Sequence, residues 1–446
     1  MRRLARLLSF LGAAAVVFGL SKVHAAWIAD PPYDFTGSFR FAWAVGYVLL
    51  LWVLGYGFGL PELPRSIGSA TVTATTVSAC AAAGVSVVQL LVGDALLPRF
   101  VVFGSALVLV PWQVGVNALA RSGRSRDQER DRVAVVSTPI ECERLRADLD
   151  LVPERPASLA GHLEPTQATG TGDRRPLIDL VLAEHASVVV LDRDALGVPD
   201  VVSQAASLHE GGVRVRTLSQ FYEEWLGKLP VGELERASLF FDIGEVHRVR
   251  YARIKRMLDV ALAMLGLAVF LVTIPLIATV DLVANRGPLF FSQERVGWNG
   301  RTFRILKYRT MLPEGVAGVE DGTWTVESDP RITAFGRLLR VTHLDELPQV
   351  VNILRGELAV VGPRPEQPRY VRELSASLPF YGMRHLVRPG LTGWAQVKYG
   401  YAGDERDALE KLQYEFFYLR HQGLRFDLRV IGRTVRSVLG GPGGGR

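Results

Sequence analysis

Four long apolar stretches lie within residues 1–120 and limit what this chain can fold into. They cover residues 7–20, 41–60, 70–92 and 100–118. A helix needs about 20 apolar residues to cross a bilayer, and the last three stretches come close to that length. The first is shorter but continues through Val23 to Trp27. The sequence therefore predicts a four-helix transmembrane domain over residues 1–120.

Basic residues around these stretches predict how the bundle is oriented. The arginines before the first stretch also resemble the start of a signal peptide, but three more apolar stretches follow at once, so we expect a retained helix. Arginines collect at the two ends of the bundle, and basic residues favour the cytoplasmic side. The end arginines are Arg2, Arg3, Arg6, Arg121, Arg124, Arg126, Arg130 and Arg132, against Lys22, Arg40, Arg65 and Arg99 in the loops. Both ends of the bundle are therefore expected in the cytoplasm.

The net charge of +6 favours anionic partners. Membrane lipid headgroups and anionic substrates fit this charge. Nucleic acid is not expected as a partner, because the positive charge is spread along a membrane protein without a recognition motif. Cys80 lies in an apolar stretch and Cys142 in an expected cytosolic segment, so the two cysteines form neither a disulfide framework nor a metal pattern.

Strand-like and helix-like segments alternate after a charged linker at residues 121–132. The expected strands are residues 133–136, 187–191 and 213–217, the expected helices are 141–149 and 177–184, and the Pro/Gly/Thr-rich segment 153–176 is an expected loop. This alternation predicts a small, Rossmann-like parallel α/β domain over residues 121–245. The turn after its first strand lacks the glycines that a dinucleotide needs, so we assign it no ligand and expect a regulatory or scaffolding role.

A further apolar segment at residues 260–280 contains Pro275. Basic residues flank it on both sides, which conflicts with the charge asymmetry of a single span. Proline removes a helix hydrogen bond, so we expect a helix–break–helix that enters the inner leaflet and returns. The alternative is an ordinary fifth span with a proline kink. The flanking cations are Arg248, Arg250, Arg253, Lys255 and Arg256 before it, and Arg286, Arg295, Arg301, Arg304, Lys307 and Arg309 after it.

The adjacent acids Asp345 and Glu346 lie among many arginines in sequence, namely Arg331, Arg337, Arg340, Arg355 and Arg364. Carboxylates suit a divalent metal and arginines match phosphate, so the segment predicts phosphate chemistry. A positive helix end and nearby arginines would keep Asp345 ionised, as a nucleophile or a metal ligand. The alternative is structural, because Thr342 to Asp345 matches a helix-capping pattern.

Three neighbouring segments contribute further candidates. Residues 297–300 form an expected hairpin turn, after which Lys307 and Arg309 alternate on one strand face and could hold phosphate. Arg364 lies in an expected rigid turn after a strand, between two prolines. Residues 409–439 mix aromatics with arginines, as in a helix at the membrane interface or one packed on the domain core. Asp427 is the one acid of that stretch that could join the site, although a solvated charge is the simpler interpretation.

Together these blocks resemble the monotopic polyprenyl-phosphate phosphoglycosyltransferases, the bacterial sugar transferases. The resemblance covers about residues 250–440. The motifs that carry it are KRMLD at 255–259, FFSQERVGWNGRTFRILKYRTM at 290–311, DPRITAFGRLLRVTHLDELPQVVNILRGELAVVGPRP at 329–365 and RPGLTGWAQV at 388–397. It implies an α+β catalytic domain over residues 246–446 with a re-entrant helix at about 257–284. The preceding spans and α/β domain are similar to those of the large members that initiate exopolysaccharide, capsule or O-antigen synthesis.

The resemblance also implies a two-step reaction on Asp345. Asp345 would attack the sugar-bearing phosphoryl group of a UDP-sugar and release UMP, and undecaprenyl phosphate would then take the phosphosugar. Mg²⁺, bound at Asp345, would neutralise phosphoryl oxygens. Glu346 would lie beside the nucleophile. The remaining implied roles are phosphate binding by Lys307, Arg340 and Arg364, a late family acid at Asp427, and a helix-breaking proline at Pro275. Ile274 departs from the family pattern, because minimal members often carry serine there.

The expected protein is thus a multidomain enzyme of the bacterial inner membrane, with its catalytic domain on the cytoplasmic face. Its expected partners are a UDP-sugar, undecaprenyl phosphate and membrane lipid, and a homodimer stays open. The sequence does not choose between glucose, galactose and N-acetylated sugars, because all present the same diphosphate. Two other functions stay open: a non-catalytic scaffold of a polysaccharide assembly complex, and an aspartyl-phosphate phosphatase.

Overall fold

The computed structural model describes most of the chain in two compact units. The first unit comprises Met1–Arg124 and Arg425–Arg436, and the second comprises Ser125–Leu424 and Ser437–Arg446. The expected linker at residues 121–132 falls largely outside the described residues. These are residues 2–61, 64, 66–92, 96–121, 131–151, 157–170, 174–230, 248–284, 288–311, 331–399 and 405–438.

The first unit contains the four helices that the apolar stretches predict. They are α1 (Arg2–Val23), α2 (Phe39–Phe58), α3 (Ile67–Val92) and α4 (Arg99–Arg121), and α1 continues into the π-helical turn η1 (His24–Ile28). Val17, Tyr47 and Val101 lie in their shared core, while Trp27 and Leu107 are exposed. A helix bundle with an apolar exterior as well as an apolar core suits a bilayer.

Four described helices are long and apolar enough to cross a membrane. Three belong to the first unit, and the fourth is α11 (Arg248–Ala284) of the second. The qualifying segments are Leu4–Ile28, Phe39–Phe58, Arg99–Ala120 and Tyr251–Leu282. Helix α3 has the expected place and length but is not among them.

The C-terminal helix α17 (Leu424–Val438) packs against α2 within the first unit. A Cβ atom on Gly57 would lie 3.0 Å from the Cα atom of Gly432. The two backbones therefore approach so closely that only glycine fits at the crossing. Arg429 adds a 3.4 Å hydrogen bond from Nη2 to the Tyr56 hydroxyl.

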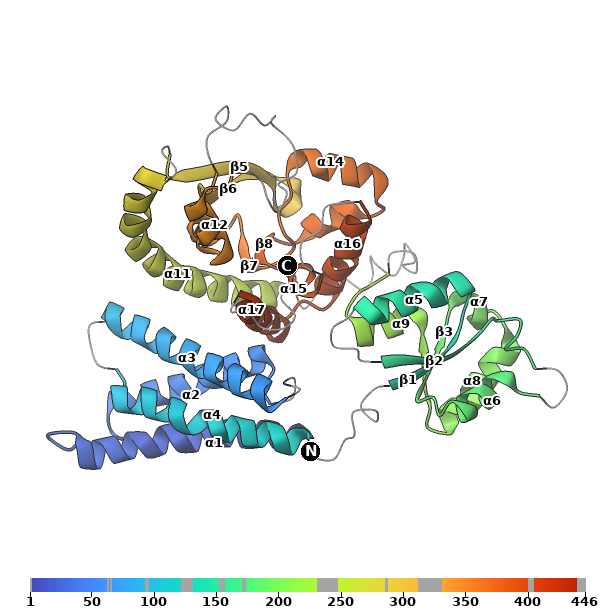
Figure 1. The fold of residues 1–446 in the computed structure, drawn as a ribbon, viewed down its shortest axis with the longest axis horizontal. Helices are drawn as coiled ribbons and strands as arrows, with labels where there is room; N and C mark the ends of the chain where they lie inside the picture. The colour runs from blue at the N-terminus through green and yellow to red at the C-terminus, as the bar shows by residue number, and fades with distance from the viewer. Residues whose placement is uncertain are drawn as a thin grey trace. The chain divides into compact units, whose positions relative to one another are not determined.

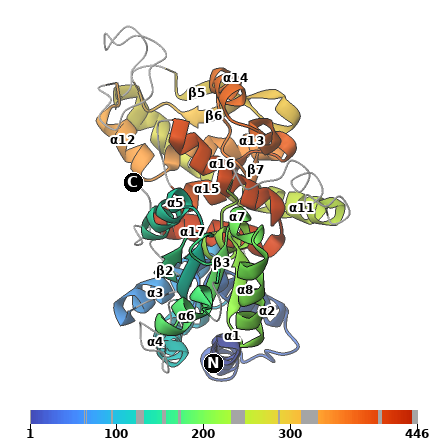
Figure 2. The ribbon, with the colours of Figure 1, turned by 90° about the vertical axis from the view of Figure 1, so that its right-hand side faces the viewer.

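The first part of the second unit is a parallel α/β domain (Figures 1 and 2). Its strands are β1 (Asp131–Val136), β2 (Ala157–Leu163), β3 (Val188–Leu191) and β4 (Arg214–Thr217), hydrogen-bonded in the order β2-β1-β3-β4 and parallel throughout. Its helices are α5 (Pro139–Leu151), α6 (Pro176–Ala183), α7 (Arg193–Leu196), α8 (Pro199–Glu210), α9 (Leu218–Phe221) and η2 (Tyr222–Leu226). Helices α5 and α9 cover one face of the sheet and α6 and α8 the other (Figure 1). Burial on both faces explains the continuous apolar runs VAVV of β1 and VVVL of β3.

Strand β2 corrects the sequence prediction, which treated residues 153–176 as a loop. Six residues of β2 pair in parallel with β1 across a register shift at Val133 and Ala134. The strand lies at the sheet edge and is only partly buried, so it lacks the apolar alternation or run that announces a strand. Its Gly161 approaches Leu180 so closely that a Cβ atom would lie 2.6 Å from Cδ1 of Leu180.

The remainder of the second unit mixes short strands and helices, as the predicted α+β domain requires. Strands β5 (Phe290–Val296) and β6 (Thr302–Tyr308) form an antiparallel hairpin around η4 (Trp298–Gly300). Asn299 and Gly300 have φ angles of 53° and 73°, which confirms the predicted hairpin turn. The other elements are α12 (Ala334–Val341), η5 (Leu344–Gln349), α13 (Val350–Arg355), β7 (Ala359–Val361), α14 (Pro368–Ser377), η6 (Tyr381–Leu386), β8 (Gly390–Thr392), α15 (Trp394–Lys398) and α16 (Glu405–Arg420), with β7 and β8 parallel.

Helix α11 runs through Pro275 as one curved helix of 37 residues (Figure 1). The expected break at Pro275 is therefore wrong as a helix end, because proline removes one backbone donor and the helix bends instead of stopping. Phe270 and Ile277 pack on the domain core, whereas Val272 and Leu276 are 69% and 68% exposed. The helix thus has an apolar inner face against protein and an apolar outer face suited to lipid.

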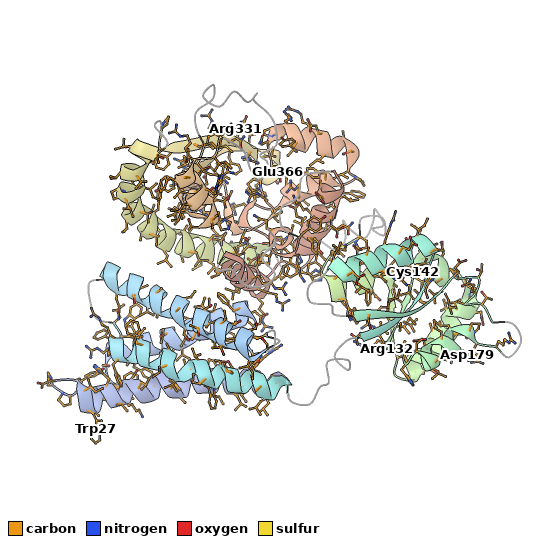
Figure 3. The ribbon with its side chains drawn as sticks, in the orientation of Figure 1. Trp27, Arg132, Cys142, Asp179, Arg331 and Glu366 are labelled. Atoms are coloured by element: carbon orange, nitrogen blue, oxygen red, sulfur yellow. The ribbon has the colours of Figure 1, made fainter. Side chains whose placement is uncertain are left out.

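The amphipathic stretch at residues 409–439 is divided between α16 and α17. In α16, Tyr414, Phe416 and Tyr418 are each less than 5% exposed. The interpretation as a helix packed on the domain core is therefore correct for α16. The side chains of this part of the second unit fill the space inside the curve of α11 (Figure 3).

Candidate active site

Asp345 and Glu346 lie in the 3₁₀ helix η5, between α12 and α13. The residue before η5, His343, has a φ angle of 55°, so the chain turns sharply there. The Thr342 hydroxyl donates to the Leu338 carbonyl at 2.8 Å, back into α12. Thr342 therefore ends one helix and does not cap the next, so the predicted Thr342 cap is wrong, although both acids do lie in the first turn of η5 as the structural alternative expects.

Of the two acids, Glu346 is the one that forms ion pairs with nearby cations. Lys307 Nζ lies 2.6 Å from Glu346 Oε1, and Arg364 Nη2 lies 3.4 Å from the same oxygen. Burial alone would raise the pKa of Glu346, but the charges of Arg364 and Lys307 hold this pKa at about 2. Strand β6, helix η5 and the turn after β7 thus bring together three residues that the sequence selected.

Asp345 has the opposite electrostatic setting. Its side chain is buried, and burial raises its pKa above the ordinary value, with the Lys307 charge opposing and the Glu346 charge adding to the rise. This corrects the expectation that a helix end and arginines favour its ionised form, because the nearest cations are engaged by Glu346. A carboxylate with a raised pKa is a stronger base and a better nucleophile once it is ionised.

The other candidate residues are distributed unevenly. Arg340 donates from Nε to the Thr310 hydroxyl at 3.0 Å, and its charge acts to lower the pKa of Asp345. Arg309 precedes Thr310 and is buried. Arg337 and Arg355 are exposed, so the arginines that surround the pair in sequence do not all surround it in space.

Asp427 lies in α17 of the first unit, and its side chain is 1% exposed. It is therefore not the solvated charge of the simpler interpretation. Its place in the reaction stays a prediction, as does that of Pro275 in α11.

Asn352 is a structural residue of the site that sequence reasoning missed. It is 1% exposed and joins α13 to β6. Its amide nitrogen donates to the Arg304 carbonyl at 2.8 Å, and its amide oxygen accepts from the Leu306 backbone at 3.0 Å. These two hydrogen bonds fix β6, and with it Lys307, relative to α13, the helix that follows Asp345 and Glu346. The available signal was a lone polar residue inside the apolar run at residues 350–354.

The carboxylates can be tested for their fit to Mg²⁺. Within the described ranges, no group of three or more His, Cys, Asp or Glu residues could hold a metal ion. Glu346 is already paired with two cations, which leaves Asp345 as a single carboxylate donor. Mg²⁺ is commonly bound by one or two carboxylates together with waters and substrate phosphates. The site fits a metal ion that shares its ligands with a diphosphate, and does not fit an all-protein cage.

Comparison with known proteins places these residues in a defined family. The bacterial sugar transferase family model matches residues 250–441. A UDP-N-acetylgalactosamine-undecaprenyl-phosphate N-acetylgalactosaminephosphotransferase of Aeromonas hydrophila is 38% identical over 197 residues, which are 43% of this chain and 45% of the relative. A UDP-glucose:undecaprenyl-phosphate glucose-1-phosphate transferase of Xanthomonas campestris pv. campestris is 36% identical over 221 residues, 49% of this chain and 44% of the relative.

A third relative is covered more completely. The UDP-glucose:undecaprenyl-phosphate glucose-1-phosphate transferase of Caulobacter vibrioides is 39% identical over 201 residues, 44% of this chain and 73% of the relative. The matched region spans less than half the length of the Aeromonas and Xanthomonas proteins. The matched residues 250–441 include Asp345, Glu346 and the cations that contact Glu346, Lys307 and Arg364. The chain therefore belongs to the bacterial sugar transferase family.

Proposed function

We propose that this protein transfers a sugar 1-phosphate from a UDP-sugar to undecaprenyl phosphate and so starts the assembly of a polysaccharide. The observation that carries the proposal is the division of the acid pair, in which Glu346 is held ionised by Lys307 and Arg364 while Asp345 is a buried carboxylate of raised pKa. The activities for which the family relatives are named support the same donor and acceptor classes.

In the first step an Asp345 oxygen attacks the sugar-bearing phosphorus of the UDP-sugar. A bond forms between that oxygen and phosphorus, and the bond from phosphorus to the bridging oxygen breaks. UMP leaves with the bridging oxygen and its electron pair, and the phosphosugar stays on Asp345 as an acyl phosphate. The cations beside Glu346 are placed to balance phosphate charge, since phosphoryl transfer depends mainly on positioning and electrostatic stabilisation.

In the second step an oxygen of undecaprenyl phosphate attacks the same phosphorus. The bond to Asp345 breaks, the carboxylate is regenerated and the product is a polyprenyl diphosphate sugar. When bound at Asp345, Mg²⁺ would supply positive charge to the phosphoryl oxygens. Lys307 and Arg364 orient phosphate, Arg340 adds positive charge from α12, and Arg309 completes the proposed substrate-binding set of the second unit.

The proposed setting is the cytoplasmic surface of the bacterial inner membrane. The exposed apolar face of α11 supports a re-entrant path, in which the curved helix enters one leaflet and returns the chain to the surface. A soluble nucleotide sugar and a lipid phosphate can both reach a carboxylate at that surface. We assign the parallel α/β domain to a Rossmann-like class that serves a regulatory or scaffolding role.

The decisive experiment measures UMP release by the detergent-purified protein from a panel of UDP-sugars, with undecaprenyl phosphate as acceptor. Wild type is expected to release UMP from one or a few donors, and Asp345→Asn, which keeps the side-chain volume, is expected to lose the activity. Mass spectrometry of wild type given donor without acceptor should find the phosphosugar on the peptide containing Asp345. Transfer by Asp345→Asn at the wild-type rate would overturn the mechanism, and a wild type inactive on every donor would favour the scaffold.

A further inference from the structure

The turn that carries Arg364 is held at every residue from Val361 to Glu366. Each residue of the turn uses a backbone group in a hydrogen bond to another element. The bonds run from Tyr418 Oη to Val361 O at 3.3 Å, Gly362 N to Thr392 O at 2.9 Å, Gly390 N to Pro363 O at 2.8 Å, Arg384 Nη2 to Arg364 O at 2.8 Å, Arg295 Nη1 to Pro365 O at 3.2 Å and Val296 N to Glu366 O at 2.9 Å. The carbonyls matter here because Pro363 and Pro365 have no backbone N–H to donate.

Arg384 is the donor that holds the carbonyl of Arg364 itself, and its side chain is committed on every side. Its Nε donates to Glu415 Oε2 at 2.9 Å and its Nη2 to Glu415 Oε1 at 2.7 Å, a two-pronged fork. Its Nη1 donates to the Tyr381 hydroxyl at 2.6 Å. Arg384 is 4% exposed and Glu415 is 5% exposed.

These hydrogen bonds give Arg384 a different role from Arg364, whose carbonyl it binds. A guanidinium forked to a buried carboxylate has its charge balanced within the protein and presents no open face to a substrate phosphate. Arg364, in contrast, is partly exposed and extends to Glu346, beside the buried Asp345. The two arginines are thus joined through the Arg364 carbonyl but point to different partners.

We propose that Arg384 and Glu415 are a positioning pair for the transfer reaction, which fixes the backbone of Arg364 so that its guanidinium meets Glu346 and the substrate phosphate. The proposal rests on the proposed function for its kinetic consequences. Its geometric content, that the fork immobilises the turn, is independent of that function. A displacement of about 1 Å in a group that orients substrate can cost up to about 100-fold in rate, so a remote pair of this kind has a measurable effect.

The kinetic test compares Arg384→Lys, Arg364→Gln and the double variant by UMP release. Lysine keeps the positive charge at residue 384 but cannot reproduce the fork and the bond to the Arg364 carbonyl together. We expect Arg384→Lys to raise KM for the UDP-sugar about tenfold, as Arg364→Gln does, and to add less than about twofold in the Arg364→Gln background. Equal effects of Arg384→Lys in both backgrounds, or an unchanged kcat and KM in Arg384→Lys, would overturn the proposal.

Glu410→Gln provides the matched control. Glu410 lies five residues before Glu415 on the same helix, but pairs with Lys228 and not with the turn. This variant tests whether loosening α16 alone affects the site. We expect Glu410→Gln to lower the unfolding temperature while the donor KM stays within about twofold of wild type. A donor KM raised as much as in Arg384→Lys would assign the effect to α16 as a whole and overturn the proposal.

Hydrogen–deuterium exchange tests the geometric content without any substrate. We expect Arg384→Lys and Glu415→Gln to speed exchange in the peptide covering residues 359–367 about tenfold or more, and Glu410→Gln to leave that peptide unchanged. Unchanged exchange of this peptide in Arg384→Lys would overturn the positioning proposal even in an active enzyme. Faster exchange in a protein that releases no UMP would sustain the geometry while the proposed function failed.

Discussion

Replacing Glu346 with glutamine should destabilise the protein by an amount that depends on pH. Its pKa falls from an ordinary 4.5 to about 2 in the folded protein, with the Glu346 side chain only 15% exposed. At about 1.4 kcal/mol per pH unit, this difference links roughly 3 kcal/mol of folding free energy to the ionised carboxylate at neutral pH. Glutamine lacks the charge, so Lys307 and Arg364 would lose the carboxylate oxygen that both of them contact.

The sign of the pH dependence follows from the lowered pKa. Above pH 4.5 the carboxylate is ionised in both the folded and the unfolded chain, and the full contribution to stability is present. As the pH falls from 4.5 towards 2, the unfolded chain takes up the proton first, and the contribution disappears. Wild type and Glu346→Gln should therefore differ most in unfolding temperature at pH 7, differ less at pH 3 and converge as the pH falls through about 2. Thermal unfolding followed by tryptophan fluorescence in detergent measures both.

Asp345→Asn is the matched control, one residue away. Burial raises the pKa of Asp345, so its ionised form is disfavoured in the folded protein, and a neutral amide should keep or increase stability at pH 7. Adjacent substitutions that remove one negative charge each are thus expected to have opposite effects. The reasoning is refuted if both lower the unfolding temperature equally, or if the difference between wild type and Glu346→Gln is the same at pH 7 and pH 3.

Three further substitutions test how the site is held. Gly336→Ala would place a Cβ atom 2.0 Å from the Thr310 carbonyl oxygen, so it should cost about 1–3 kcal/mol in stability and lower UMP release by disturbing the segment that Arg340 contacts. His343→Val should cost about 1–2 kcal/mol because a β-branched residue disfavours a φ of 55°, whereas His343→Asn should stay near wild type in the same unfolding assay. Asn352→Ala should cost about 2–4 kcal/mol by leaving the Leu306 amide unpaired, and should raise the donor KM if Lys307 moves.

The helices of the first unit were predictable because long apolar runs have few alternatives. The sheet strands β1 and β3 were predictable for a related reason, since short valine-rich runs between helices indicate buried parallel strands. Strand β4 is RVRT and half-buried, and it was predicted from its place after Gly211 and Gly212. Strand β2 was not predictable, because its side chains are small and half-buried and its partner β1 comes earlier in the chain. Local sequence carries little information about an edge strand whose stability comes from pairing.

The sequence predicted which residues form the site better than it predicted which of them are in contact. Sequence spacing selected Lys307, Glu346 and Arg364, which the structure brings together from β6, η5 and the turn after β7. It also counted Arg337 and Arg355 around the acid pair, although both are exposed. Nearness in sequence does not determine which face of a short helix a side chain occupies, and five charges near one acid pair in sequence can point in several directions.

The division of roles between Asp345 and Glu346 depends on that same geometry. In a 3₁₀ helix, successive side chains point about 120° apart, so adjacent residues meet different surroundings. Glu346 meets the two cations, and the first influence on Asp345 is burial. Their pKa values are therefore shifted in opposite directions, which is the arrangement that separates a reacting carboxyl from a charge-holding one. A carboxylate paired with lysine and arginine is a poor nucleophile because its electron pairs are engaged. This contrast supports the proposed mechanism, in which Glu346 keeps the cations in place and Asp345 forms the bond with phosphorus.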